Sequence, residues 1–162
     1  MTFQIFNDID SKMIKSFATF LNDNKPTKNN RIEIFLNSNG GDIDHCGALF
    51  KMINDRKDDI KITAYGVIYS AAFELYVLAE CEKTILPNTK GMYHRSSRLI
   101  NMTSAGTPKD ADDEINLKSL IADEANTIKV CDIAKMSDDA KAVIFSNKEA
   151  YFTYEELKEM LM

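Results

Sequence analysis

Apolar residues along the chain switch repeatedly between strand-like and helix-like spacing. Alternating or unbroken apolar runs predict strands over 3–6, 31–36, 60–64, 81–86 and 91–94. Apolar residues at helical spacing predict helices that begin near Asp10, Gly41 and Ser70, and a capping-box sequence predicts a last helix that begins at Thr153. Gly66 is expected to end the third strand. This order of strands and helices predicts an α/β fold, in which helices pack against a mostly parallel sheet.

A longer helical pattern runs without interruption from Asp112 to Lys135. At about 1.5 Å per residue, such a helix is about 35 Å long. Because that exceeds what a small domain covers, we expect the helix to project and to pack on another subunit. We interpret the chain as a single domain over 1–162, with a head over about 1–107 and 145–162 and a projecting handle over about 108–144.

The composition is typical of one soluble globular domain. The 162 residues are 44% hydrophobic and 28% charged, and no apolar run reaches the length of a membrane span. The net charge of −5 argues against nucleic acid as a partner, and the N-terminus lacks the pattern of a signal peptide. Cys46, Cys81 and Cys131 lie far apart and lack metal-ligand spacing. We therefore predict core thiols in a cytoplasmic protein that holds no metal and no cofactor.

Three features with the chemistry of acyl transfer fall at or just after predicted strand ends. The Gly40-Gly41 turn can bring backbone N–H groups close to a reacting atom, because no Cβ intervenes. Ser70 and His94 each follow a strand, and ligands of parallel sheets gather beyond the carboxyl ends of the strands, so all three are expected on one rim. A hydroxyl, a glycine turn and an imidazole are the minimum set for catalysis by an activated serine. Taken singly, Ser70 also fits a helix cap and His94 a structural histidine.

Three segments, taken together in their order and spacing, form a more specific signal than any one of them does alone. They are Leu36-Asn37-Ser38-Asn39-Gly40-Gly41, then Gly66-Val67-Ile68-Tyr69-Ser70-Ala71, then Leu86-Pro87-Asn88 followed by Met92-Tyr93-His94. Together they resemble the proteolytic subunit of the Clp protease, a serine peptidase of the crotonase-like superfamily. The resemblance covers nearly the whole chain and implies the ClpP/crotonase-like fold with its handle helix. It also implies a serine endopeptidase that cuts unfolded polypeptides inside a homo-oligomeric chamber of rings, heptameric in that family.

The resemblance implies a catalytic triad. Ser70 matches the nucleophile and His94 the base, while Glu149 stands where the family has an aspartate. As a hypothesis, His94 takes the proton of Ser70 during attack on a peptide carbonyl and returns it to the leaving amine. A carboxylate one methylene longer than aspartate can still orient an imidazole. The alternative is that Glu149 is a surface acid, which would weaken the function.

The resemblance also implies where the substrate is held. The glycine pair matches the oxyanion turn of the family, so the N–H groups of Gly41 and Ala71 are the expected oxyanion donors. The Ala71 donor suits this role because it lies in the first turn of a helix, where N–H groups are unsatisfied and the dipole favours negative charge. Gly40 and Ile43 are expected to contact the substrate.

Some residues depart from the pattern of the family. Tyr69 replaces a small residue before the nucleophile, so we expect it to reshape the pocket beside Ser70. The chain starts almost at its first strand, which leaves little for the axial loops that engage an AAA+ unfoldase. An unfoldase partner is therefore disfavoured.

Other functions remain open at this point. A catalytically impaired structural or regulatory subunit is favoured by Glu149 and Tyr69, and a phage-type maturation protease fits a short chain of this kind. A crotonase-type acyl-CoA enzyme is the least favoured, because such enzymes do not need a serine and a histidine at these spacings. Hydrolysis of a small fluorogenic peptide separates a peptidase from the inactive subunit and the acyl-CoA enzyme.

Overall fold

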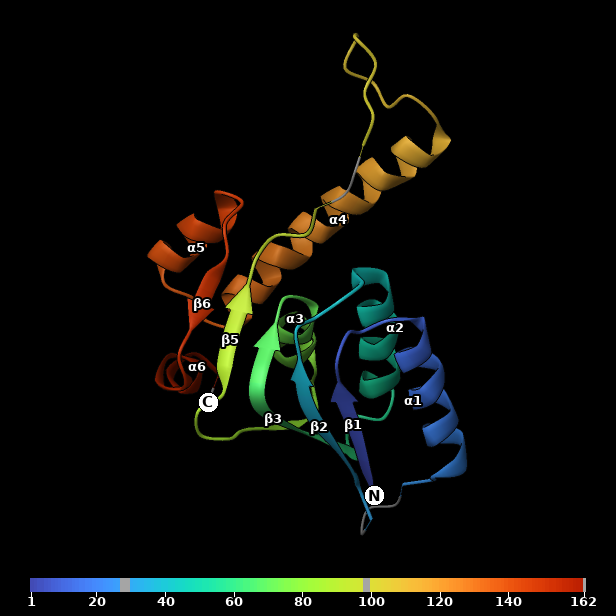
Figure 1. Cartoon of the computed structure of the whole chain (residues 1–162), viewed down its shortest axis with the longest axis vertical. Coiled ribbons are helices and arrows are strands. Elements are labelled where there is room, and N and C mark those ends of the chain that lie inside the picture. Colours follow the sequence, from blue (N-terminus) through green and yellow to red (C-terminus); the bar gives the residue numbers. More distant parts are fainter. Residues whose placement is uncertain (27–29, 98–99, 162) are drawn as a thin grey trace.

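The computed structural model describes residues 1–26, 30–97 and 100–161. Within them, one sheet contains β1 (Thr2–Phe6), β2 (Ile32–Ser38), β3 (Ile60–Tyr69), β4 (Glu82–Ile85), β5 (Lys90–Tyr93) and β6 (Ala150–Phe152). The helices are α1 (Ser11–Asp23), α2 (Ile43–Asn54), α3 (Ala71–Leu78), α4 (Ala111–Ile133), α5 (Asp138–Phe145) and α6 (Tyr154–Leu161). Figure 1 shows α1 and α2 near the β1 edge of the sheet, and α5 and α6 near β6.

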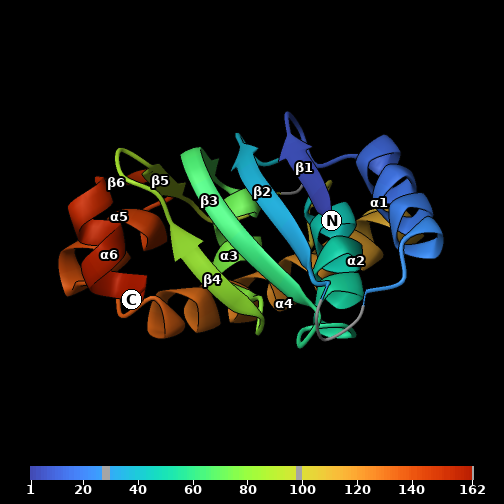
Figure 2. The same cartoon turned by 90° about the horizontal axis from the view of Figure 1, so that it is seen from below.

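The sheet is parallel except at one edge. β1, β2 and β3 are parallel neighbours, β4 pairs with the first half of β3, and β5 pairs with its second half. Figure 2 shows β4 and β5 beside different parts of β3. Only β6 is antiparallel, and it pairs with β5. The predicted α/β fold with a mostly parallel sheet is therefore confirmed.

β3 does not end at Gly66, as the sequence had suggested, but continues to Tyr69. Gly66 adopts φ +67°, and the register against β2 shifts at this point. At this shift the Asn37 side chain takes the place of a backbone hydrogen-bond partner, because its oxygen accepts a hydrogen bond from the Val67 N–H at 3.0 Å. The glycine thus forms a bulge that bends the strand from β4 toward β5 rather than ending it.

Helix α3 is buried along almost its whole length. Its residues from Ala71 to Val77 are all buried, as expected for a helix that is apolar on nearly every side. Phe73 stacks between Tyr93 on β5 and Phe152 on β6, with ring centroids 5.4 and 5.5 Å away. This packing fixes the start of α3 relative to the segment that follows β5, where His94 lies.

The ends of two helices follow their sequence signals. Asp10 caps α1 by accepting hydrogen bonds from two backbone N–H groups. The predicted capping box is confirmed, because a Glu156 carboxylate oxygen accepts hydrogen bonds from the Thr153 N–H and hydroxyl at 2.7 and 2.8 Å.

Sequence analysis did not predict α5 or β6, which are too short to show a clear period.

Helix α4 agrees closely with the long helix predicted from the sequence. It runs diagonally away from the sheet, with its N-terminal end at the top of Figure 1. Four of its isoleucines have exposed fractions between 45% and 63%; these are Ile115, Ile121, Ile128 and Ile133. Among the described residues, no helix combines the length and the apolar character needed to cross a membrane.

Candidate active site

Ser70 lies at the turn that joins β3 to α3. Its backbone has φ 52° and ψ −122°, a combination that residues with a Cβ rarely adopt and that costs on the order of 1–3 kcal/mol. The turn is held by hydrogen bonds from the Ser70 N–H to the Met92 carbonyl at 2.8 Å and from the Glu74 N–H to the Ser70 carbonyl at 3.0 Å. The Ser70 side chain makes no capping hydrogen bond to α3. Its hydroxyl is therefore not used as a helix cap, which was the alternative interpretation.

The Gly40-Gly41 turn lies directly against Ser70. Gly40 has φ +103°, and a Cβ on it would meet the Ser70 Cβ at 2.9 Å. Gly41 has φ +143°, and a Cβ on it would overlap the backbone of Ile9. The short bridge to Ile9 uses the Gly40 carbonyl and the Asp42 N–H. The Gly41 N–H takes no part in that bridge, and no hydrogen bond joins it to another described residue.

A cavity of about 260 Å³ opens beside Ser70. Five of the predicted site residues line it: Gly41, Ile43, Ser70, Ala71 and His94. Gly40 is close behind them, against Ser70. The structure thus brings together the residues predicted on one rim of the sheet, whereas Glu149 is not among the residues that line this cavity.

His94 directly follows β5 and is half-buried in the same cavity. Its Nδ1 lies 2.8 Å from the carbonyl oxygen of Arg95. Because a carbonyl oxygen can only accept, Nδ1 carries the proton, and in the neutral ring Nε2 is then the basic nitrogen. In the described part of the chain no hydrogen bond joins His94 to the Ser70 hydroxyl. The two side chains share a cavity without being engaged with each other.

Glu149 directly precedes β6, which pairs with the strand that His94 follows, but its carboxylate is engaged elsewhere. It is exposed, lines a separate cavity, and accepts a hydrogen bond from the Tyr151 hydroxyl at 2.5 Å. The antiparallel register of β5 and β6 pairs Tyr93 with Ala150. The printed pairing ends there: His94 directly follows Tyr93, and Glu149 directly precedes Ala150. The Glu149 carboxylate is held by Tyr151 and makes no hydrogen bond to His94 among the described residues.

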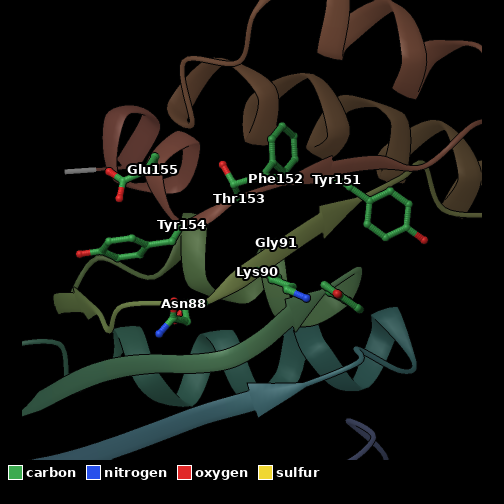
Figure 3. Close-up of a pocket in the computed structure, with 10 residues that line it drawn as sticks. Asn88, Lys90, Gly91, Tyr151, Phe152, Thr153, Tyr154 and Glu155 are labelled. Atoms are coloured by element: carbon green, nitrogen blue, oxygen red, sulfur yellow. The ribbon is translucent and has the colours of Figure 1, made fainter.

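A larger cavity, of about 460 Å³, is lined by residues of β5, β6 and the start of α6 (Figure 3). Tyr69 lines it and packs edge-on against Tyr151, with ring centroids 6.1 Å apart. Tyr69 does not line the cavity beside Ser70. Tyr69 thus contributes to the larger cavity, and its predicted effect on the pocket beside Ser70 stays a prediction.

Sequence analysis assigned no role to Glu74, a buried acid in the cavity beside Ser70. Glu74 lies one helical turn after Ser70, lines the cavity and is only 7% exposed. Burial raises the pKa of Glu74, a hydrogen bond of 3.1 Å from the Tyr93 hydroxyl partly offsets this, and the nearby Asp123 carboxylate raises it further. The available signal was a lone acid in the otherwise apolar stretch Ala71–Leu78.

We expect Glu74→Gln to raise the melting temperature at neutral pH. The folded protein binds the Glu74 proton more tightly than the unfolded chain does, because the folded-state pKa is raised. The free energy of unfolding therefore falls as pH rises above about 4.3, the pKa of a glutamate in the unfolded chain. It stays at the lower value once the pH exceeds the pKa of Glu74 in the folded protein. Glutamine avoids that loss and can still accept a hydrogen bond from Tyr93. Thermal unfolding should show a gain at about pH 8 that vanishes near pH 4.

Glu80→Gln is the matched control for this measurement. Glu80 is exposed, and a hydrogen bond from Lys57 lowers its pKa, so its replacement is expected to give a small loss of opposite sign at about pH 8. A gain for Glu74→Gln that is the same at both pH values would contradict the raised pKa.

The three cysteines are buried and free, as predicted. The Cys46 thiol donates to the Ala71 carbonyl at 3.1 Å, and so supports the first turn of α3. Burial raises the pKa of all three thiols. Since the thiolate is the reactive form, the cysteines do not compete with Ser70 as nucleophiles.

Known proteins resemble this chain in sequence profile and in fold. The sequence profile of a family described as Clp protease matches residues 2–154. Among solved structures, the chain is similar to that of a ClpP1 mutant from Listeria monocytogenes, with a TM-score of 0.73 and 21% sequence identity. The match covers 98% of this chain and 86% of the other. The predicted fold, with its long helix, is therefore confirmed over nearly the whole chain.

Proposed function

The chain belongs to the Clp protease family, and from that premise we propose that it is a serine endopeptidase acting on unfolded polypeptides inside an oligomeric chamber. One observation carries the proposal. Ser70 is held in a strained turn, its hydroxyl is not used as a helix cap, and it faces a cavity that it shares with His94. Strand-to-helix turns of this kind expose the nucleophile in other serine hydrolases.

In the proposed reaction, Ser70 Oγ attacks the peptide carbonyl carbon while His94 Nε2 takes the hydroxyl proton. The carbonyl oxygen becomes an oxyanion, which the N–H groups of Gly41 and Ala71 stabilise. The C–N bond then breaks, His94 gives the proton to the leaving amine, and water attacks the acyl-enzyme by the same route in reverse. The Gly41 N–H supports this role because no described residue accepts a hydrogen bond from it, and Ala71 supports it as the first residue of α3.

We assign Glu149 the task of orienting His94 after a change of hydrogen-bond partner. In the proposed active form, its carboxylate leaves Tyr151 and accepts from His94 Nδ1, in place of the Arg95 carbonyl. The pairing of β5 with β6 supports this step, because it ends at Tyr93 and Ala150, the direct chain neighbours of His94 and Glu149.

Glu149→Ala should lower kcat/KM for a fluorogenic peptide by about 10²–10⁴-fold, because the base then lacks its orienting carboxylate. Tyr151→Phe should raise kcat/KM about fivefold, since it removes the hydrogen bond that holds Glu149 away. Tyr154→Phe, which removes a hydroxyl from the cavity beside Tyr151, is the matched control and should have no effect. Unchanged activity of Glu149→Ala would exclude Glu149 from the triad.

Assembly and location belong to the same proposal. Clp protease subunits form oligomeric chambers, and the exposed isoleucines of α4 suit a helix that packs on another subunit. Three buried, unpaired cysteines suit the reducing conditions of the cytoplasm. We propose no unfoldase partner.

A catalytically impaired ring subunit is the second candidate. It is favoured by the missing hydrogen bond between Ser70 and His94 in the described residues, and by the contact of Glu149 with Tyr151. A fluorophosphonate probe separates the two candidates, because it reacts only with an activated serine. The peptidase predicts labelling that maps to Ser70 and cleavage of unfolded casein, whereas the impaired subunit predicts neither.

A further inference from the structure

Glu74 has a position that the proposed reaction does not use. It lies four residues after Ser70 in α3, so the two are separated by about 6 Å along the helix axis. Both line the same cavity, and Glu74 is 7% exposed. Its one hydrogen bond from a described side chain comes from the neutral Tyr93 hydroxyl. A carboxyl group thus forms part of the wall of the cavity that a substrate residue at Ser70 would enter.

No described Lys or Arg side chain forms an ion pair with this carboxylate, although Lys129 lines the adjoining cavity. Among the described residues, no ion pair involves Glu74, and the charged side chains lining the cavity beside Ser70 are acidic; apart from Glu74 they are Asp42 and Asp44. Both of these acids have interactions of their own, Asp42 with His45. A buried carboxylate without a cation is costly, so such groups are commonly found where a ligand supplies the opposite charge.

The space around Glu74 extends away from Ser70. A second cavity, of about 270 Å³, adjoins the first and shares Ile43, Asp44 and Glu74 with it. A side chain that starts at Ser70 would therefore pass along Ile43 and reach Glu74 about one helical turn deeper. A long, unbranched side chain with an apolar stem and a charged end fits this path.

We propose that this cavity selects a lysine or arginine side chain at the substrate residue whose carbonyl Ser70 attacks, with the Glu74 carboxylate as the counter-charge. The inference rests on the proposed function, in which Ser70 is the nucleophile. An entering ammonium or guanidinium group supplies the positive charge for an ion pair with Glu74. The Tyr93 hydroxyl holds the carboxylate in place.

The test compares fluorogenic peptides that differ only at that substrate residue, which is lysine, arginine or norleucine. Norleucine has an unbranched apolar side chain without the charge, so it isolates the contribution of the cation. We expect kcat/KM to be at least about tenfold higher for the lysine and arginine peptides than for the norleucine peptide. Equal rates, or faster cleavage after norleucine, would overturn the proposal.

Variants at Glu74 separate selectivity from a purely structural role. Glu74→Gln should remove the preference, so that kcat/KM for the lysine peptide falls to the level of the norleucine peptide cut by the same variant. Glu74→Leu should make norleucine the better substrate. Tyr93→Phe removes the hydrogen bond but keeps the charge, so most of the preference should survive. A structural role would instead lower cleavage of all peptides in parallel, and that result would overturn the proposal.

Failure of this proposal can be distinguished from failure of the proposed function. The fluorophosphonate probe carries no amino-acid side chain, so its reaction with Ser70 does not depend on Glu74. A protein that reacts with the probe but prefers norleucine overturns the specificity assignment alone. A protein that neither reacts with the probe nor cuts any peptide overturns the proposed function and this inference with it.

Discussion

Ser70→Ala is expected to abolish labelling by a fluorophosphonate and to lower peptide hydrolysis by at least about 10³-fold, toward the residual rate that binding and oxyanion donors provide alone. The substitution removes only the hydroxyl oxygen and keeps the Cβ. Since that hydroxyl makes no capping hydrogen bond, the fold should be unchanged. The measurements are gel fluorescence of the labelled protein, kcat/KM for a fluorogenic peptide, and circular dichroism.

The matched control is Ser97→Ala. Ser97 lines the same cavity and offers a second hydroxyl there, but it lies in a segment without the strained turn of Ser70. We expect this variant to label and to hydrolyse peptide like the wild type. Equal labelling of Ser70→Ala and wild type would remove Ser70 as the nucleophile.

A third variant tests whether the turn stores strain. Ser70→Gly should have a higher melting temperature than Ser70→Ala, because glycine adopts φ 52° without the steric cost that a Cβ imposes, on the order of 1–3 kcal/mol. Both variants should be inactive. A lower melting temperature for Ser70→Gly would mean that the turn is not strained.

Gly40→Ala is expected to cause the largest combined loss of stability and activity. A Cβ at Gly40 would meet the Tyr69 carbonyl oxygen at 2.7 Å, the Ser70 Cβ at 2.9 Å and the Ala71 nitrogen at 3.0 Å. These are backbone atoms or atoms bonded directly to backbone, so no side-chain rotation relieves the clash, and φ +103° is itself unfavourable for alanine. We expect a loss of about 3 kcal/mol in the free energy of unfolding, and a displaced Ser70 with at least about 10²-fold lower kcat/KM.

Gly47→Ala is the matched control for this loss. Gly47 lies inside α2, and a Cβ on it would have no heavy atom within 4 Å. Replacing a glycine in a helix interior typically adds up to about 1 kcal/mol of stability. Urea unfolding should therefore move in opposite directions for the two variants. Wild-type stability and activity in Gly40→Ala would show that the turn and Ser70 are not packed against each other as described.

The end of β3 and the strand β6 show where the local sequence pattern does not predict the structure. Gly66 has the sequence signature of a strand end, yet β3 continues because the Asn37 side chain, 30 residues away, supplies the missing hydrogen-bond partner. β6 has only three residues, too few for a period to be visible. It exists because β5 offers an unpaired edge, a contact that sequence spacing does not reveal.

The residues with catalytic chemistry could largely be found in the sequence, because their signals are local. The order of strands and helices determined a mostly parallel sheet, and the position of Ser70, the glycine pair and His94 after strand ends placed them on one rim. The long helix of α4 was likewise visible from its uninterrupted period. The chemistry of a serine, a histidine and backbone N–H groups does not depend on distant contacts.

Only the tertiary structure decided how these groups are connected. Glu149 directly precedes the strand that pairs with β5, but its carboxylate is held by Tyr151. The direction of a side chain depends on neighbours that a linear sequence does not specify. Glu74 is part of the cavity because α3 packs against β5, a contact that the sequence does not specify. The sequence determined which reactive groups this protein has, because residue type and local period are written along the chain. The packing of α3, β5 and β6 decided which of those groups face one another.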